Sequence, residues 1–171
     1  MKKSILIFLA IVMVVGFSNK AVAQATASAT ATATIVTPIA ITKTVDMNFG
    51  NVAVTGTAGT VVLTPAGTRS VTGGVTLPNV TGTVAAASFN VAGEGAYTYA
   101  ITLPSTGYTI TKAVTLETMT VNAFTSTPSG TGELTAGAQT LTVGATLNVG
   151  VAQVAGVYTN ATGFDVTVNY N

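Results

Sequence analysis

Cysteine, histidine and tryptophan do not occur in this 171-residue sequence, and only 6% of its residues are charged. Without histidine or cysteine the chain has no imidazole base, no thiolate nucleophile, no zinc site and no disulfide. Six basic residues against five acidic ones leave no basic surface that would attract nucleic acid. We therefore expect no cofactor, no metal site, no nucleic-acid partner and no enzymatic activity.

What the sequence does contain is a large share of small and β-branched residues. Hydrophobic residues make up 48% of it, with many Thr, Val, Ala and Gly, and aromatic residues only 6%. β-Branched side chains favour a pleated, half-buried surface, and low charge argues against both a helical bundle and a charged disordered chain. This composition predicts one compact all-β domain.

The first 23 residues have the pattern of a secretory signal peptide of bacterial type. Three residues with two lysines precede a 14-residue apolar run at 4–17, and Ala-Val-Ala at 21–23 supplies a cleavage pattern. As a helix the run would rise about 21 Å, short of the roughly 30 Å of a bilayer core. We expect export to the periplasm, then the cell surface or medium, and no membrane span in the mature chain.

Removing residues 1–23 takes away half of the cations. The mature chain keeps three cations against five carboxylates, a net charge of −2, from Lys43, Arg69, Lys112, Asp46, Glu94, Glu117, Glu133 and Asp165. With so little charge, electrostatic steering of partners is weak. An exported chain without disulfides must be held together by its core and backbone pairing.

Apolar residues alternate with polar ones through most of the mature chain. Three runs show it best, at 97–103, 141–149 and 164–170. A period of two places the apolar set on one face of a sheet. Gly- and Pro-rich stretches separate such runs, and we interpret 55–59, 65–67 and 73–74 among others as turns. The pattern predicts an immunoglobulin-like antiparallel β-sandwich over 39–171, possibly one strand short.

An Ala/Thr tract dominates the N-terminal extension, residues 24–38. Every second residue of the tract is apolar: Ala25, Ala27, Ala29, Ala31, Ala33 and Ile35. Two interpretations stay open at this point. The tract is either a flexible lead-in, as is common at chain ends, or a strand about 36 Å long that pairs with a sheet edge in this molecule or the next.

Four short motifs give the sequence a family likeness. They are Met-Asn-Phe-Gly at 47–50, Val-Gly-Ala-Thr-Leu at 143–147, Gly-Val-Tyr at 156–158 and Val-Thr-Val-Asn-Tyr at 166–170. Together they resemble the bacterial domain-of-unknown-function family 4402 over nearly all of 25–171. The Phe-Gly start and the Gly-x-Tyr end also resemble, more loosely, archaic chaperone–usher pilins and spore-coat-U-type domains.

The pilin resemblance implies a sandwich that lacks its last strand and is completed by a strand from another molecule. Residues 25–35 would be the donor strand for the next copy, in a head-to-tail polymer. A periplasmic chaperone would occupy the groove before assembly. The groove and chaperone-pairing strand implied here comprises Phe164, Val166, Val168, Tyr170 and Asn171.

Two functions therefore remain as expectations. The first is a structural subunit of a bacterial surface filament, and the second is a monomeric secreted or surface β-sandwich that binds an unknown ligand. Glu94 and Glu133 lie in Gly-rich segments, where we interpret them as solvated loop carboxylates rather than a catalytic pair.

Overall fold

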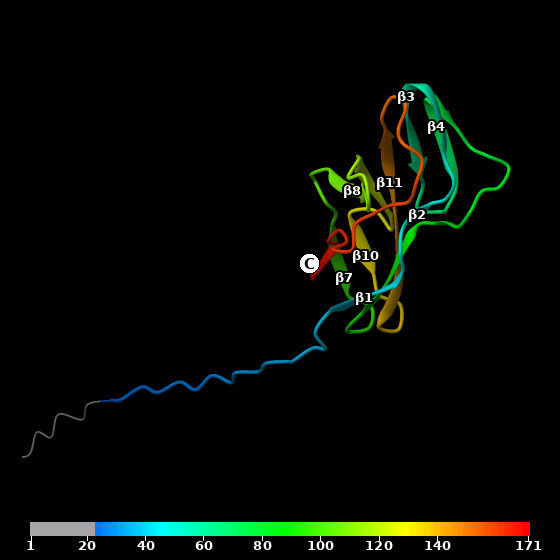
Figure 1. The fold of residues 1–171 in the computed structure, drawn as a ribbon. Helices are drawn as coiled ribbons and strands as arrows, with labels where there is room; N and C mark the ends of the chain where they lie inside the picture. The colour runs from blue at the N-terminus through cyan, green and yellow to red at the C-terminus, as the bar shows by residue number, and fades with distance from the viewer. Residues whose placement is uncertain (1–22) are drawn as a thin grey trace, which may run out of the picture. The chain divides into compact units, whose positions relative to one another are not determined.

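The computed structural model describes residues 23–171, so the expected signal peptide lies outside the described residues apart from Ala23. The chain falls into two units, one ending at Ile35 and the other running from Val36 to Asn171 (Figure 1). Residues 23–35 form no helix or strand, and their side chains are exposed. A strand is stabilised when its backbone N–H and C=O groups form hydrogen bonds with a neighbouring strand. A tract without such a neighbour has no hydrogen bonds of this kind to stabilise it as a strand. Its pairing with a sheet edge stays a prediction.

The second unit is all-β, as the composition predicts, and its strands pair antiparallel. The larger sheet has the order β1-β6-β11-β9-β8-β12, with β3 paired to the far half of β11 and β4 paired to β3. Its strands are β1 (Ala40–Val45), β3 (Ala53–Leu63), β4 (Arg69–Thr76), β6 (Ala87–Ala92), β8 (Tyr108–Lys112), β9 (Thr118–Thr127), β11 (Ala138–Val149) and β12 (Tyr158–Thr159). Among residues 23–171 no helix is long and apolar enough to cross a membrane.

Two smaller sheets complete the unit. One has the order β10-β7-β13, and the other pairs β2 with β5. Their strands are β2 (Asn48–Phe49), β5 (Val84–Ala85), β7 (Thr98–Thr102), β10 (Thr131–Glu133) and β13 (Thr167–Tyr170). In Figure 1 β7, β1 and the C-terminus lie at one end of the unit, and the β3–β4 hairpin lies at the other.

β11 is the central strand of the unit. Its expected alternation is confirmed, because its apolar residues from Leu141 to Val149 are at most 5% exposed. One side of β11 pairs with β6 along residues 138–143 and with β3 along 145–149, while β9 pairs with the other side. Two core clusters follow from this division of β11 between partners.

The two clusters share no fully buried residue. The first lies under β6, β7 and β13 and comprises Ala87, Phe89, Val91, Tyr99, Leu134, Leu141, Val143 and Val168. The second lies under β3, β4 and β9 and comprises Val61, Val75, Val121, Ala145, Leu147 and Val149. Since each cluster takes residues from β11, this one strand contributes to both cores.

Two expected turns are wrong. Residues 55–59 lie within β3 and residues 73–74 lie within β4, where the register of the pair shifts between Val54 and Gly59. A Cβ on Gly59 would collide with the backbone of Thr72, and Gly73 has a φ of +66°. These glycines therefore allow a close approach and a bulge inside a hairpin, for which glycine is suited. The turn expected at 65–67 does join β3 to β4.

The strand order matches an immunoglobulin-type sandwich. Such a domain has one sheet in the order ABED and a second in the order CFG. Here β1-β6-β11-β9 has the order A-B-E-D, and the neighbours β7 and β13 take the places of C and F. Among the described residues, β13 pairs with β7 alone, so no described strand occupies the place of G beside it.

Candidate functional site

β13 is the strand on which the candidate site is built. It covers Thr167–Tyr170, shorter than the 164–170 run in the sequence. Phe164 precedes the strand, and its ring packs against the core. The centroid of this ring lies 4.8 Å from that of Phe124 and 5.9 Å from that of Tyr108. Within β13, Val168 is buried and its neighbours in sequence are exposed, as alternation requires.

One edge of β13 is fully used. Its four residues pair antiparallel with β7, from Thr167 opposite Thr102 to Tyr170 opposite Tyr99. Beyond the strand, the Asn171 side-chain amide donates a hydrogen bond to Thr98 Oγ1 at 3.0 Å. The C-terminal residue is therefore held on the β7 side.

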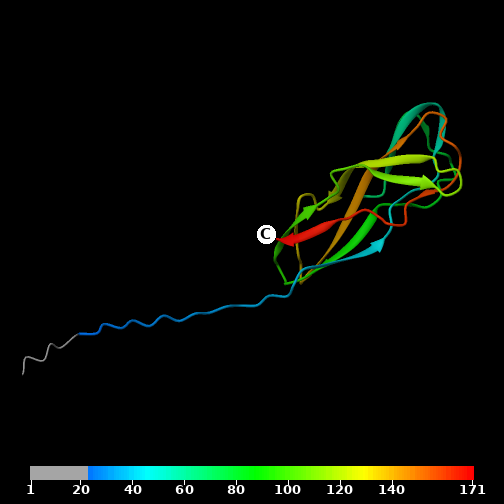
Figure 2. The ribbon, with the colours of Figure 1, turned by 60° about the vertical axis from the view of Figure 1, so that its left-hand side comes forward.

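The other edge of β13 pairs with no strand in the part of the chain that the structure describes. β13 ends the order β10-β7-β13, and β1 likewise ends the larger sheet. β1 and β13 contact each other, so the free edges of the two sheets border the same side of the unit. In Figure 2 β13, in red, runs along this side to the C-terminus.

Apolar side chains line these two edges without being fully covered. They pack against the first core cluster yet stay partly exposed: Ile39, Ile41, Phe164, Val166 and Tyr170. Between residues 164 and 171 the only charged side chain is that of Asp165. Natural proteins usually protect a free, apolar edge with charge, proline or a covering segment. This edge has little such protection along residues 164–171.

A hydrogen-bonded clasp joins the far end of β13 to the root of the N-terminal extension. The Tyr170 hydroxyl accepts from Glu94 N at 2.6 Å and donates to Thr37 O at 2.8 Å. Thr37 N in turn donates to Glu94 Oε2 at 2.9 Å. A Cβ on Gly93 would collide with the Tyr170 hydroxyl, so the clasp needs glycine there. The clasp fixes where the chain leaves this unit toward residue 35.

The clasp also changes the acidity of Glu94. Hydrogen bonds from the backbone and side chain of Thr37 lower the pKa of this carboxyl below its ordinary value. Such bonds favour the ionised form. We expected Glu94 to be a solvated loop carboxylate. Its side chain also accepts a hydrogen bond from Thr37 N, 57 positions away in the sequence.

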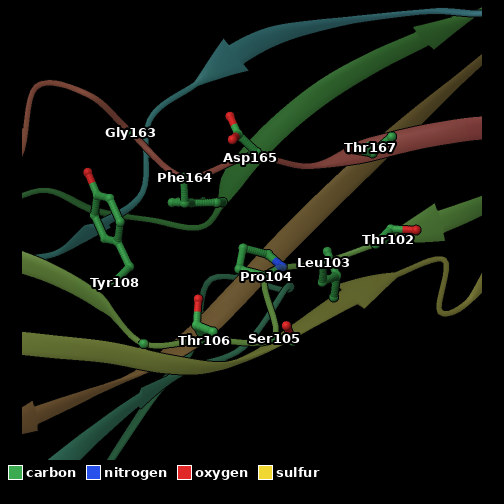
Figure 3. Close-up of a pocket in the computed structure, with 11 residues that line it drawn as sticks. Thr102, Leu103, Pro104, Ser105, Thr106, Tyr108, Gly163, Phe164, Asp165 and Thr167 are labelled. Atoms are coloured by element: carbon green, nitrogen blue, oxygen red, sulfur yellow. The ribbon is translucent and has the colours of Figure 1, made fainter.

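A hollow of about 410 Å³ opens where β13 begins. Its lining comes from two segments, 102–108 and 163–167, which Figure 3 shows facing each other. Leu103, Pro104 and Phe164 supply apolar surface, while the carboxylate of Asp165 points away from Leu103 and Pro104 in Figure 3. Burial raises the pKa of the Tyr108 hydroxyl, which donates to Asn160 O at 2.9 Å.

The sequence indicated only part of this site. It singled out the residues of the C-terminal strand, and the structure brings Val168 and Tyr170 together in β13, with Phe164, Val166 and Asn171 flanking it. The clasp and the hollow were missed, because each joins segments distant in sequence. Glu133, interpreted as a loop carboxylate, is the last residue of β10. Within residues 23–171 no three His, Cys, Asp or Glu side chains gather as a metal site would require.

The fold and the site together define a class: an immunoglobulin-type β-sandwich in which, among residues 23–171, β13 is paired along one edge only. The model of the domain of unknown function DUF4402 matches residues 39–170. The chain belongs to this family, which confirms the resemblance seen in its motifs. No curated protein and no solved structure matches the chain significantly. The looser pilin resemblance stays a prediction.

Proposed function

We propose that this chain is the structural subunit of a bacterial surface filament in which each molecule accepts a strand from the next. Residues 25–35 of one copy add to the free edge of β13 in another. The observation that carries the proposal is this edge, where half-buried apolar side chains flank a strand that has a partner on one side only. Strand addition supplies backbone hydrogen bonds for affinity and side-chain pockets for specificity.

The chemistry of the extension supports the same proposal. Residues 24–42 contain no charged side chain, so adding 25–35 to an apolar edge buries no unpaired charge. Small alanine side chains suit an edge behind which Val168 and Tyr99 are already 7% and 0% exposed. A head-to-tail contact that does not close on itself produces a filament.

The proposal includes a route for the chain. The signal peptide expected at residues 1–23 would direct export to the periplasm, and a periplasmic chaperone would cover the β13 edge there. Exchange of the chaperone strand for residues 25–35 of another copy would follow, with the filament at the cell surface. Each of these partners is needed for the same reason, which is that a free apolar edge aggregates unless covered.

The test is an unboiled denaturing gel of material sheared from the native cell surface and blotted for the mature domain. We expect a ladder that collapses to monomer on boiling, and its loss when residues 25–35 are deleted. The matched control changes the threonines of the opposite parity, such as Thr30 and Thr32, to serine and should keep the ladder. A monomer band alone for the wild-type chain would refute the filament.

A second candidate is a monomeric surface module that binds a small ligand. The hollow favours it, because its lining combines the hydroxyl-bearing residues Thr102, Ser105 and Thr106 with the apolar residues Leu103, Pro104 and Phe164. It predicts a monomer at the cell surface whether or not residues 25–35 are present, so the same gel separates the two candidates.

A further inference from the structure

Five large apolar side chains stand exposed in two loops of the second unit. They are Val114 and Leu116 in the β8–β9 turn, and Val151, Val154 and Val157 in the connection from β11 to β12. Leu116 also has a φ of +63°, a conformation that is rare for a bulky side chain. We call these five residues the apolar patch. Exposed apolar side chains that gather in one place mark interaction surfaces.

Hydrogen bonds and strand pairing hold the two loops of the apolar patch together. β12 pairs with β8, which places Tyr158 opposite Lys112. The Gln153 side-chain amide donates to Thr118 O at 3.3 Å and to the Tyr158 hydroxyl at 2.9 Å. That hydroxyl donates in turn to Val154 O at 2.6 Å. The apolar patch is therefore presented by one connected surface rather than by two independent loops.

The apolar patch and the clasp lie at opposite ends of β11. Ala138, the first residue of β11, pairs with Ala92, two residues before Glu94 of the clasp. At the other end the connection to β12 follows β11 directly, and Thr120, close to the β8–β9 turn, pairs with Asn148. β11 has 12 residues, so about 40 Å separates its two ends. In Figure 2 the yellow-green β8–β9 hairpin likewise has its turn at the end away from the C-terminus.

Propagation of a filament decides the direction of the added strand. β13 runs toward the clasp, because Tyr170 is its last residue. A donor parallel to β13 would bring the donating copy to the clasp end of the accepting copy, where the accepting copy's own extension begins. Both neighbours of a copy would then compete for one end, and the contact could not repeat. An antiparallel donor instead brings the donating copy to the side of the apolar patch.

Pairing preference and length agree with an antiparallel donor. The strand pairs of the unit are antiparallel, and antiparallel pairing is slightly the more stable arrangement. Residues 25–35 extend about 36 Å, close to the length of β11, so they can reach from the clasp end of the accepting copy to its patch end. The donating copy continues at residue 36, and its clasp holds Thr37. The clasp end of the donating copy is thereby brought to the apolar patch.

The surface of the clasp end suits an apolar partner. Its turns at 95–97 and 135–137 contain no charged side chain, and neither does segment 150–163 at the patch end. Tyr97, in the first of these turns, is 44% exposed, and its ring packs 5.5 Å from that of Tyr170. Tyrosine is enriched at protein interfaces because its ring is apolar while its hydroxyl keeps a hydrogen-bond partner. Contact between the two ends would bury no unpaired charge of these segments.

We propose that the apolar patch is the docking surface for the clasp end of the donating copy, with Tyr97 against it. This inference rests on the proposed filament and adds a second contact to it, separate from the strand that joins the copies. Two separate contacts between the same pair of copies would fix the angle between them.

The absence of cysteine allows a direct test by thiol cross-linking. A chain with both Thr135→Cys, at the clasp end, and Val157→Cys, in the apolar patch, is expressed in the native host. Sheared filaments are treated with a bismaleimide that has a short spacer. We expect a ladder that survives boiling, and only monomer from either single variant. The matched control pairs Thr135→Cys with Thr125→Cys, an exposed position opposite Gly144 in the middle of β11, and should give no such ladder.

Two outcomes would overturn the inference. One is a boil-resistant dimer from Thr135→Cys alone, which would place two clasp ends together. The other is a treated double variant that gives only monomer on boiling, although its untreated and unboiled sample shows the wild-type ladder. In both cases the filament stands and the docking surface fails. If the wild-type chain gives no ladder, the filament itself fails.

A charge placed in the apolar patch gives an independent measurement. Val157→Asp should lower the temperature at which the unboiled ladder dissociates, because docking would bury the new carboxylate. The matched Thr125→Asp should leave this temperature at the wild-type value. The urea midpoint of the Val157→Asp monomer should also stay at the wild-type value, since Val157 is 80% exposed. Equal dissociation temperatures for Val157→Asp and the wild type would contradict docking at the patch.

Discussion

The Tyr170 clasp gives the sharpest prediction about stability. Tyr170→Phe removes one hydroxyl and with it the bonds from Glu94 N and to Thr37 O. The ring is kept, so no cavity forms and its packing 5.5 Å from the Tyr97 ring remains. An intramolecular hydrogen bond contributes a net 0.5 to 1.5 kcal/mol, roughly. Two bonds with partly solvated partners make the expected loss about 1–2 kcal/mol in the free energy of unfolding.

The assay is urea unfolding of the mature chain followed by tyrosine fluorescence or far-UV circular dichroism. Wild type and variant are compared at one protein concentration, since assembly shifts apparent stability. Tyr97→Phe is the matched control, because the Tyr97 hydroxyl takes no part in the clasp and its residue is 44% exposed. A loss for Tyr170→Phe below about 0.5 kcal/mol, the usual range for surface substitutions, would refute the assigned role of the clasp.

Two further predictions concern acid stability and the core. Hydrogen bonds from Thr37 lower the pKa of Glu94 in the folded chain. The carboxylate of Glu94 therefore adds to the free energy of unfolding above its pKa in the unfolded chain, and this contribution is lost as the pH falls through its pKa in the folded chain. Glu94→Gln should make the free energy of unfolding fall less steeply as the pH is lowered. Glu117, whose pKa is also lowered, should account for the slope that remains. An unchanged pH–stability profile would contradict this prediction. Leu141→Ala, at a fully buried position, should cost about 2–5 kcal/mol in urea unfolding. Val151→Ala, at a 64% exposed position, should cost less than about 0.5 kcal/mol, and equal losses would contradict the core assignment.

Strands that alternate regularly could be predicted from the sequence. The run that became β11 was recognised because each of its apolar residues from Leu141 to Val149 lies on one face. The glycines of the β3–β4 hairpin could not be interpreted correctly, because glycine suits both a turn and a bulge. Only the partner strand decides between them, through contacts such as that of Gly59 with Thr72.

The candidate site was predicted in part, for a related physical reason. Apolar and polar residues alternate along 164–170, and this local pattern can be read directly from the sequence. The clasp joins Tyr170 to Thr37 across 133 positions, and the hollow joins two loops. Such juxtapositions depend on strand order and register, which no single segment determines.

β11 has a mechanical consequence for the unit. Its 12 residues extend about 40 Å and take part in both core clusters. Ladder hydrogen bonds lie perpendicular to antiparallel strands, so a force applied along β11 shears its bonds to β6, β3 and β9 together. A force applied across β11 would instead peel them apart one after another. A sandwich of this design resists tension best along its central strand.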